Sequence, residues 1–204
     1  GNSELGDYFK DPLERQANGF ASGLLMPKRL VKPLTDDRVI CIALNKPVGV
    51  VCTAASSVKN NIIYHVGHSE RVFPIGRLDK DSQGLILLTN KSGLAEFILK
   101  SDYQHEKEYL VTTNQAYDND VLDAFLRGVF IGKGMPRAKA KSVKRLSPRR
   151  MLITLETGMK RQIRMMCKAL HLNVARLVRV RIGMIIDTGL EPGRWAELSE
   201  EDIQ

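Results

Sequence analysis

Apolar positions gather in short runs separated by turns, and these runs predict strands. Runs rich in β-branched residues indicate strands at 39–44, 50–53 and 72–75, with a turn at 46–49. The run at 84–89 is almost wholly apolar, which is typical of a strand buried on both faces. Two further strands are predicted at 109–113 and 151–155.

Three stretches instead have apolar positions at helical spacing. The first can be capped by Asn90 or Ser92, and its apolar face is Leu94, Phe97 and Ile98. The second follows Asp118 or Asn119, with a face of Val121, Leu122, Phe125 and Leu126. The third, 160–170, joins an apolar face of Ile163, Met166, Cys167 and Leu170 to a basic stripe of Arg161, Arg164 and Lys168. From the pattern alone, it is either an ordinary surface helix or one that lies against RNA.

The order of these elements bounds the fold. Strands outnumber helices and are not regularly interleaved with them, which predicts an α+β fold with a mostly antiparallel sheet flanked by helices and loops. Residues 1–36 show no persistent period and are punctuated by Gly and Pro, so we expect a leader or linker there. The folded domain is expected to span 37–204.

Charge is distributed very unevenly along the chain. The net charge is +8, yet 132–186 holds fifteen Lys and Arg against the single acid Glu156. Such a basic segment fits a polyanionic partner, either nucleic acid or anionic lipid. No apolar run approaches the roughly 18 residues that a membrane-spanning helix needs. Three widely spaced cysteines argue for reduced thiols rather than a disulfide framework or a zinc site.

The densest polar sequence is Gly76-Arg77-Leu78-Asp79-Lys80-Asp81-Ser82-Gln83-Gly84-Leu85. It lies just before the apolar strand, and loops held by a rigid sheet are favoured places for catalytic groups. Its acids also match the opening of a calcium-binding loop, but Asn90 stands where that loop needs a glutamate. The third interpretation is a turn with solvated charges.

Four ordered blocks resemble the pseudouridine synthases of the RsuA type. The loop at 76–90 is similar to that family's signature loop, and 44–50 resembles its first motif. Residues 106–111 resemble its tyrosine motif, and 158–166, followed by 176–183, its third motif. The resemblance covers roughly residues 38–204 and implies the pseudouridine synthase catalytic fold. An S4 RNA-binding domain usually precedes this fold in the family; 1–36 is too short for one, so we expect it to be absent or truncated.

The resemblance also implies roles for individual residues. Asp79 would be the catalytic carboxylate, with Arg164 as its partner. Tyr109 would stack on the flipped uracil and assist removal of the C5 proton, or else be a packed core tyrosine. Leu177 would line the uracil pocket, and Arg77 would enter the RNA stack or else pair with Asp81. Contact with RNA is further expected from Lys107, Lys160, Arg161 and Arg179.

The resulting expectation is an isomerase that converts a specific uridine to pseudouridine in structured RNA, with 23S (large-subunit) rRNA as the first choice. Small-subunit rRNA and tRNA stay open as targets. The alternative from another class is a non-catalytic RNA-binding or ribosome-assembly factor on the same fold. The reaction is redox-neutral, so we expect no cofactor and no metal. We also expect a cytoplasmic monomer with no membrane partner.

Overall fold

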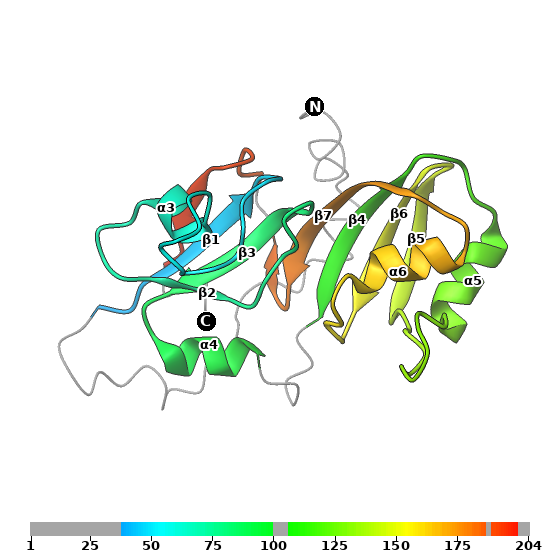
Figure 1. Cartoon of the computed structure of the whole chain (residues 1–204), viewed down its shortest axis with the longest axis horizontal. Coiled ribbons are helices and arrows are strands. Elements are labelled where there is room, and N and C mark those ends of the chain that lie inside the picture. The colour runs from blue at the N-terminus through cyan, green and yellow to red at the C-terminus, as the bar shows by residue number, and fades with distance from the viewer. Residues whose placement is uncertain (1–37, 100–105, 187–188, 200–204) are drawn as a thin grey trace.

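The computed structural model of the chain describes residues 38–99, 106–186 and 189–199 (Figure 1). The predicted leader at 1–36 lies outside the described residues. Four helices occur in the described ranges: α3 (Ile62–Val66), α4 (Ser92–Leu99), α5 (Asn119–Arg127) and α6 (Gln162–Ala169). None of the helices within these ranges is long and apolar enough to cross a membrane.

One mixed sheet organises the molecule. Its strands within the described ranges are β1 (Cys41–Lys46), β2 (Phe73–Ile75), β3 (Gln83–Thr89), β4 (Lys107–Thr113), β5 (Ser142–Ser147), β6 (Arg150–Leu155), β7 (Val174–Ile182), β8 (Ile185–Ile186) and β9 (Trp195–Glu197). Their order is β5-β6-β4-β7-β3-β1-β9, with β2 beside β3 and β8 beside β7. Each strand pair in the described ranges is antiparallel except β3 with β7, which confirms the expected α+β class.

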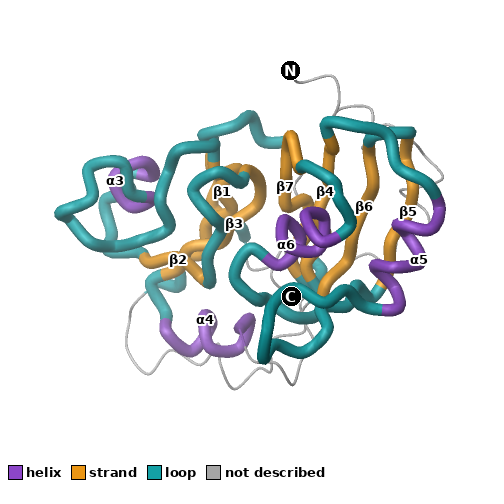
Figure 2. The backbone as a smooth tube through the Cα atoms, turned by 45° about the vertical axis from the view of Figure 1, so that its right-hand side comes forward, coloured by secondary structure: helices purple, strands orange, loops and turns teal. Residues whose placement is uncertain are grey.

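Each half of the sheet has its own apolar core. Residues of α5 and α6 pack with β4, β6 and β7 on one face, and both views show α6 in front of that half (Figures 1 and 2). In the other half, α4 covers one face of β1 and β3, while α3 and the loop around Val50 and Leu78 cover the opposite face. Tyr109 packs against the core beneath α6 and also against the one beneath α3. The two cores therefore meet on one face of the sheet.

The predictions are confirmed for elements whose apolar residues are buried. All seven residues of β3 are buried, as expected of an apolar strand in the sheet interior. Helix α4 buries its predicted apolar face. The strand predicted at 50–53 is wrong, because Val51 forms only an isolated bridge with Asn61. In α5, Phe125 is buried but Leu126 is 37% exposed, so the apolar face is narrower than predicted.

Candidate active site

The loop that carries Asp79 is held by backbone hydrogen bonds on either side of that residue. The amide of Ser82 donates to the carbonyl of Asp79 at 3.0 Å, and the amide of Gly49 donates to the carbonyl of Lys80 at 2.8 Å. The amide of Leu78 points at the buried thiol of Cys52, with a distance of 3.3 Å to Sγ. The turn at 46–49 therefore braces the loop, and Asp79 itself is half-buried.

Beneath this loop, four residues lie in register across neighbouring strands. Lys46 of β1 pairs with Gly84 of β3, Gly84 with Arg179 of β7, and Arg179 with Tyr109 of β4. Gly84 has φ +113°, and a Cβ built there would lie 2.2 Å from the carbonyl oxygen of Arg179. Only glycine fits where β3 approaches β7 so closely. This parallel β3–β7 pair joins the two halves of the sheet.

Arg179 lies under the loop and is only 3% exposed. Its Nε donates to the carbonyl of Leu85 at 2.7 Å, and its Nη1 donates to the carbonyl of Arg77 at 3.4 Å. One guanidinium thus contacts the chain on both sides of Asp79. Sequence reasoning assigned Arg179 to RNA contact; that role stays a prediction, and this burial disfavours it.

Lys46 is a second cation beneath the loop, and it is fully buried. Its Nζ donates to the carbonyls of Pro47 at 2.8 Å and Val50 at 3.0 Å. Burial lowers the pKa of Lys46, although the negative charges of Asp81 and Asp79 partly offset this effect. A buried lysine satisfied by carbonyls braces the same turn that supports Asp79.

Asp81, two residues after Asp79, bonds to helix α6. Its carboxylate accepts two hydrogen bonds from Arg161, Nη1 to Oδ1 at 3.0 Å and Nη2 to Oδ2 at 2.8 Å. Arg164 donates from Nη2 to the backbone carbonyl of Asp81 at 2.8 Å. Among the described residues, the ion pairs of Asp81 are with these two arginines and not with Arg77. The predicted partnership of Arg164 with Asp79 stays a prediction, since the contacts found for Arg164 are with Asp81 and Val174.

Tyr109 and the loop that carries Asp79 lie on the same face of the sheet. Tyr109 is the cross-strand neighbour of Arg179, whose guanidinium reaches the loop backbone, so both side chains project to the loop's side. Leu177 lies on the same face and is 6% exposed in the core beneath α6. Tyr109 is only partly buried, unlike Leu177.

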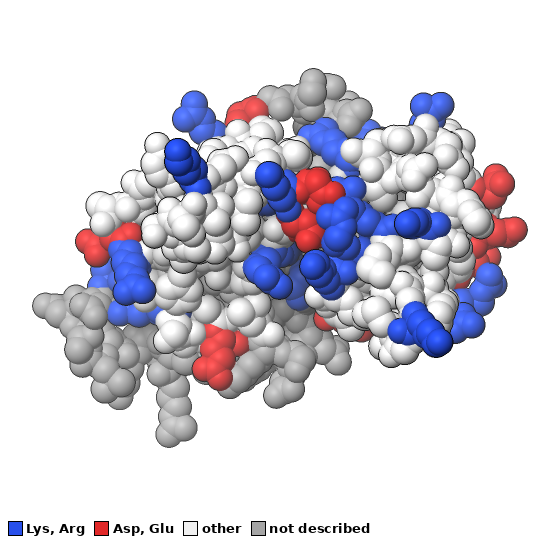
Figure 3. Space-filling view, viewed as in Figure 1, with Lys and Arg blue, Asp and Glu red and all other residues white. Residues whose placement is uncertain are grey.

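The remaining predicted RNA contacts differ in exposure. Lys160 and Arg77 are exposed, whereas Lys107 is half-buried. Burial lowers the pKa of Lys107, and the positive charge of Arg179 lowers it further. Figure 3 shows Lys and Arg side chains gathered around a small acidic group in the middle of this face, over β7 and the near end of α6.

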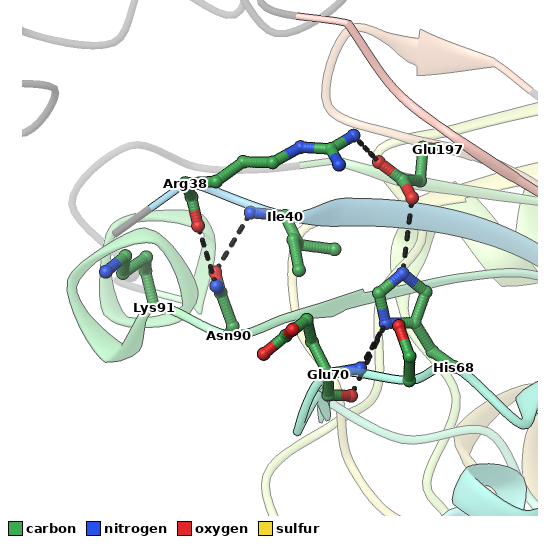
Figure 4. A pocket seen from close by; sticks show the side chains of 8 residues that line it. Arg38, Ile40, His68, Glu70, Asn90, Lys91 and Glu197 are labelled. Atoms are coloured by element: carbon green, nitrogen blue, oxygen red, sulfur yellow. Dashed lines mark hydrogen bonds and ion pairs between the residues drawn. The ribbon is translucent and has the colours of Figure 1, made fainter. Parts of the chain in front are cut away.

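A separate pocket of about 530 Å³ lies at the opposite end of β3 (Figure 4). His68 contacts Glu197 at 3.2 Å and packs edge-on against Trp195, and Glu197 also pairs with Arg38. Since β3 has seven residues, this pocket is about 20 Å from the Asp79 loop. Its polar groups are largely occupied by one another, so we do not place chemistry there. Within the described ranges, no cluster of three or more potential metal ligands occurs.

Comparison with known proteins decides the family. The model of the RNA pseudouridylate synthase family matches residues 40–169. The chain belongs to this family. It is 44% identical over 179 residues to the dual-specificity RNA pseudouridine synthase RluF of Salmonella typhi, across 86% of this chain and 60% of that protein. It therefore spans about 60% of the length of this relative.

Two further comparisons place the chain within the pseudouridylate synthase family. The ribosomal small subunit pseudouridine synthase A of Escherichia coli K12 is 31% identical over 163 residues, covering 78% of this chain and 71% of that protein. A crystal structure of a pseudouridylate synthase superposes with a TM-score of 0.73 at 28% identity, covering 80% of this chain and 72% of the other. The resemblance inferred from the four motifs is thus confirmed, together with the fold.

Sequence reasoning found the loop but missed how it is supported. Arg179 and Asp81 hold contacts that bridge 80 to 102 residues of sequence, which no local pattern reports. The available sequence signal was Gly84 at the start of the apolar strand, because a glycine in a strand often marks a close approach of another backbone. Lys46 lies in the segment 44–50 that resembles the family's first motif, but its full burial was not predicted, since a lysine at a strand end is normally exposed.

Proposed function

We propose that this chain is an RNA pseudouridine synthase that isomerises uridine in structured RNA, most simply large-subunit rRNA, with Asp79 as its catalytic carboxylate. The observation that carries the proposal is the placement of Asp79 on a braced loop, over the cross-strand row that ends in Tyr109, in a member of this family. The similarity to RluF supports RNA as the substrate.

The geometry suits a reaction that detaches uracil, turns it and rejoins it through C5. A base in a stacked helix is out of reach, so the uridine must be flipped into the site. Asp79 must be ionised to act on the ribose, as nucleophile or as base. Arg161 and Arg164 bind Asp81 of the same loop, and Lys46 lies beneath it, so the loop is surrounded by cations.

The exposed cations around the loop would position the RNA. Arg77 and Lys80 are exposed on the loop itself, and Lys160 is exposed where α6 begins. Guanidinium groups stack on bases and bind phosphates, so Arg77 would occupy the gap left by a flipped base. Tyr109 would stack on the uracil and assist loss of the C5 proton. We further propose a cytoplasmic monomer that needs no cofactor for this redox-neutral reaction.

The test is direct. The purified chain is incubated with 5-tritiated-uridine transcripts of large-subunit rRNA, small-subunit rRNA and a tRNA set, and tritium release is measured. Carbodiimide-stop sequencing then maps any pseudouridine formed. We expect release from the large-subunit transcript, with one mapped stop accounting for it. Tight RNA binding without tritium release from any transcript would instead identify a non-catalytic RNA-binding factor.

A further inference from the structure

Helix α6 and its N-cap residue contact the loop that carries Asp79 at one residue, Asp81. Arg161, at the start of the helix, forms the bidentate pair with its carboxylate, and Arg164, one turn later, donates to its carbonyl. We call these three residues the Asp81 clamp. Arg164 also lies 3.4 Å through Nε from the carboxylate. The clamp therefore fixes both the side chain and the backbone of the residue two positions after Asp79.

The clamp links the loop to the half of the sheet that carries α6, in addition to the contact of Arg179 of β7 with the carbonyl of Arg77. The bonds from Gly49 and Cys52 brace the loop within the β1–β3 half. Helix α6 belongs to the other half, where Ile163 and Met166 are buried against β4, β6 and β7. Helix α6, which buries one face in that core, thus contacts the loop at Asp81 in the described residues.

The backbone of Arg161 adopts an unusual conformation. Arg161 has φ +54°, a left-handed conformation that a residue with a side chain rarely adopts. Such strain persists only where surrounding contacts over-determine it, and it clusters at functional sites. A fork-to-fork arginine–carboxylate pair fixes direction as well as distance. Hydrogen bonding from Arg161, with the charge of Arg164, holds the pKa of Asp81 below its ordinary value and keeps the carboxylate ionised.

Folding stability does not explain the clamp. The side chains of Asp81 and Arg161 are 45% and 43% exposed, and ion pairs as exposed as this contribute little to stability. Placement of a catalytic group is far more sensitive, because a displacement of about 1 Å can cost about 100-fold in rate. The clamp should therefore matter for the order of the loop rather than for the melting temperature.

We propose that Asp81 is a positioning residue that docks the Asp79 loop on α6 and so holds Asp79 in its reactive place. The proposal rests on the proposed function for its catalytic part. It also makes a claim about the free protein, that the loop is ordered by α6, and this claim can be tested without RNA.

The experiment combines two measurements on the full chain. Amide hydrogen exchange, read by mass spectrometry, reports loop order in peptides covering 77–82 for the parent, Asp81→Asn and Arg161→Asn. Asparagine tolerates the left-handed backbone at 161 and lacks the cation, so it isolates the pair. Glu197→Gln is the control, because it removes an exposed ion pair with Arg38 at the far end of β3. Single-turnover rate and half-saturating concentration are then measured with the RNA that the parent modifies.

We expect faster exchange in 77–82 for both clamp variants and parent-like exchange for Glu197→Gln. The single-turnover rate should fall about 10- to 100-fold in Asp81→Asn, with the half-saturating RNA concentration within about 2-fold of the parent. The double variant Asp81→Asn/Arg161→Asn should react no more slowly than the slower single variant, because both changes break the same contact.

Parent-like exchange in both clamp variants would overturn the proposal. So would an unchanged rate in Asp81→Asn with weaker RNA affinity in Arg161→Asn, which would make Arg161 an RNA ligand only. If the parent itself is inactive, the proposed function fails, and the exchange data alone decide the clamp.

Discussion

Replacing Gly84 with alanine tests how the two halves of the sheet are joined. The added Cβ would lie 2.2 Å from the carbonyl oxygen, 2.5 Å from the nitrogen and 2.9 Å from the carbonyl carbon of Arg179. These are backbone atoms in a paired strand, so they cannot rotate away as a side chain would. Overpacking of this kind costs about 1–3 kcal/mol. The backbone at φ +113° adds about 1–2 kcal/mol for any residue with a Cβ.

The two terms together predict a loss of about 2–5 kcal/mol, which corresponds to a fall of about 4–20 °C in Tm for a chain of this size. Two matched variants separate the terms. Gly134→Ala has a positive φ of +78° but nothing within 4 Å of the added Cβ, and Gly158→Ala has neither feature. In thermal melts followed by circular dichroism, we expect Gly84→Ala to melt lowest, then Gly134→Ala, with Gly158→Ala near the parent. If Gly84→Ala melted no lower than Gly134→Ala, the close β3–β7 crossing would not govern stability.

Three further predictions follow from the same geometry. Tyr109→Phe keeps the ring that packs on both cores, so its folding free energy should stay within about 1 kcal/mol of the parent, while turnover falls about 100- to 10,000-fold. Single-turnover tritium release and a thermal melt measure the two effects. A fully active variant would show that the hydroxyl has no part in the mechanism. RNA affinity should fall steeply as the salt concentration rises, because the segment 132–186 is strongly basic. Each duplex phosphate that is neutralised contributes about −0.9 to the slope of log affinity against log salt concentration. A nearly flat salt dependence would argue against RNA as the partner of this segment. Because Arg161 and Arg164 lower the pKa of Asp81 in the folded state, its pairing stabilises the fold above the unfolded-state pKa and is lost as the pH falls through the lower folded-state pKa. Asp81→Asn should therefore lose slightly less stability than the parent as the pH falls below the ordinary aspartate pKa, a small effect because the pair is exposed, and a larger acid-induced loss in the variant than in the parent would contradict this.

Local sequence predicted the elements whose own apolar pattern decides their state. Strand β3 and helix α4 are examples, since each buries the side chains that its period selects. Strand β5 escaped prediction because its sequence SVKRLS is polar, and it forms by pairing with β6 at the edge of the sheet. Helix α3 is only five residues long; it is defined by the cap at Asn61, which accepts from the amide of Tyr64, and by Gly67 in the left-handed region.

For the site, the sequence located the loop and the family motifs but not the contacts that hold the loop. Asp79 and Tyr109 come from motifs recognisable in the sequence alone. The partners of Arg179 and Arg161 lie 80 to 102 residues away in the chain. The contacts of Arg179 follow from the sheet order that brings β7 beside β3, and those of Arg161 from the packing of α6 on the sheet. Long-range placement of this kind depends on tertiary packing, which no local period encodes.

The most direct test of the central claim is Asp79→Asn. Asparagine keeps the size of the side chain and removes its charge, so the half-buried loop should retain its structure. In single-turnover tritium release on the RNA that the parent modifies, the account predicts no detectable pseudouridine, with RNA affinity and Tm close to those of the parent. A variant that forms pseudouridine at the parent's rate would contradict the assignment of Asp79 as the catalytic carboxylate.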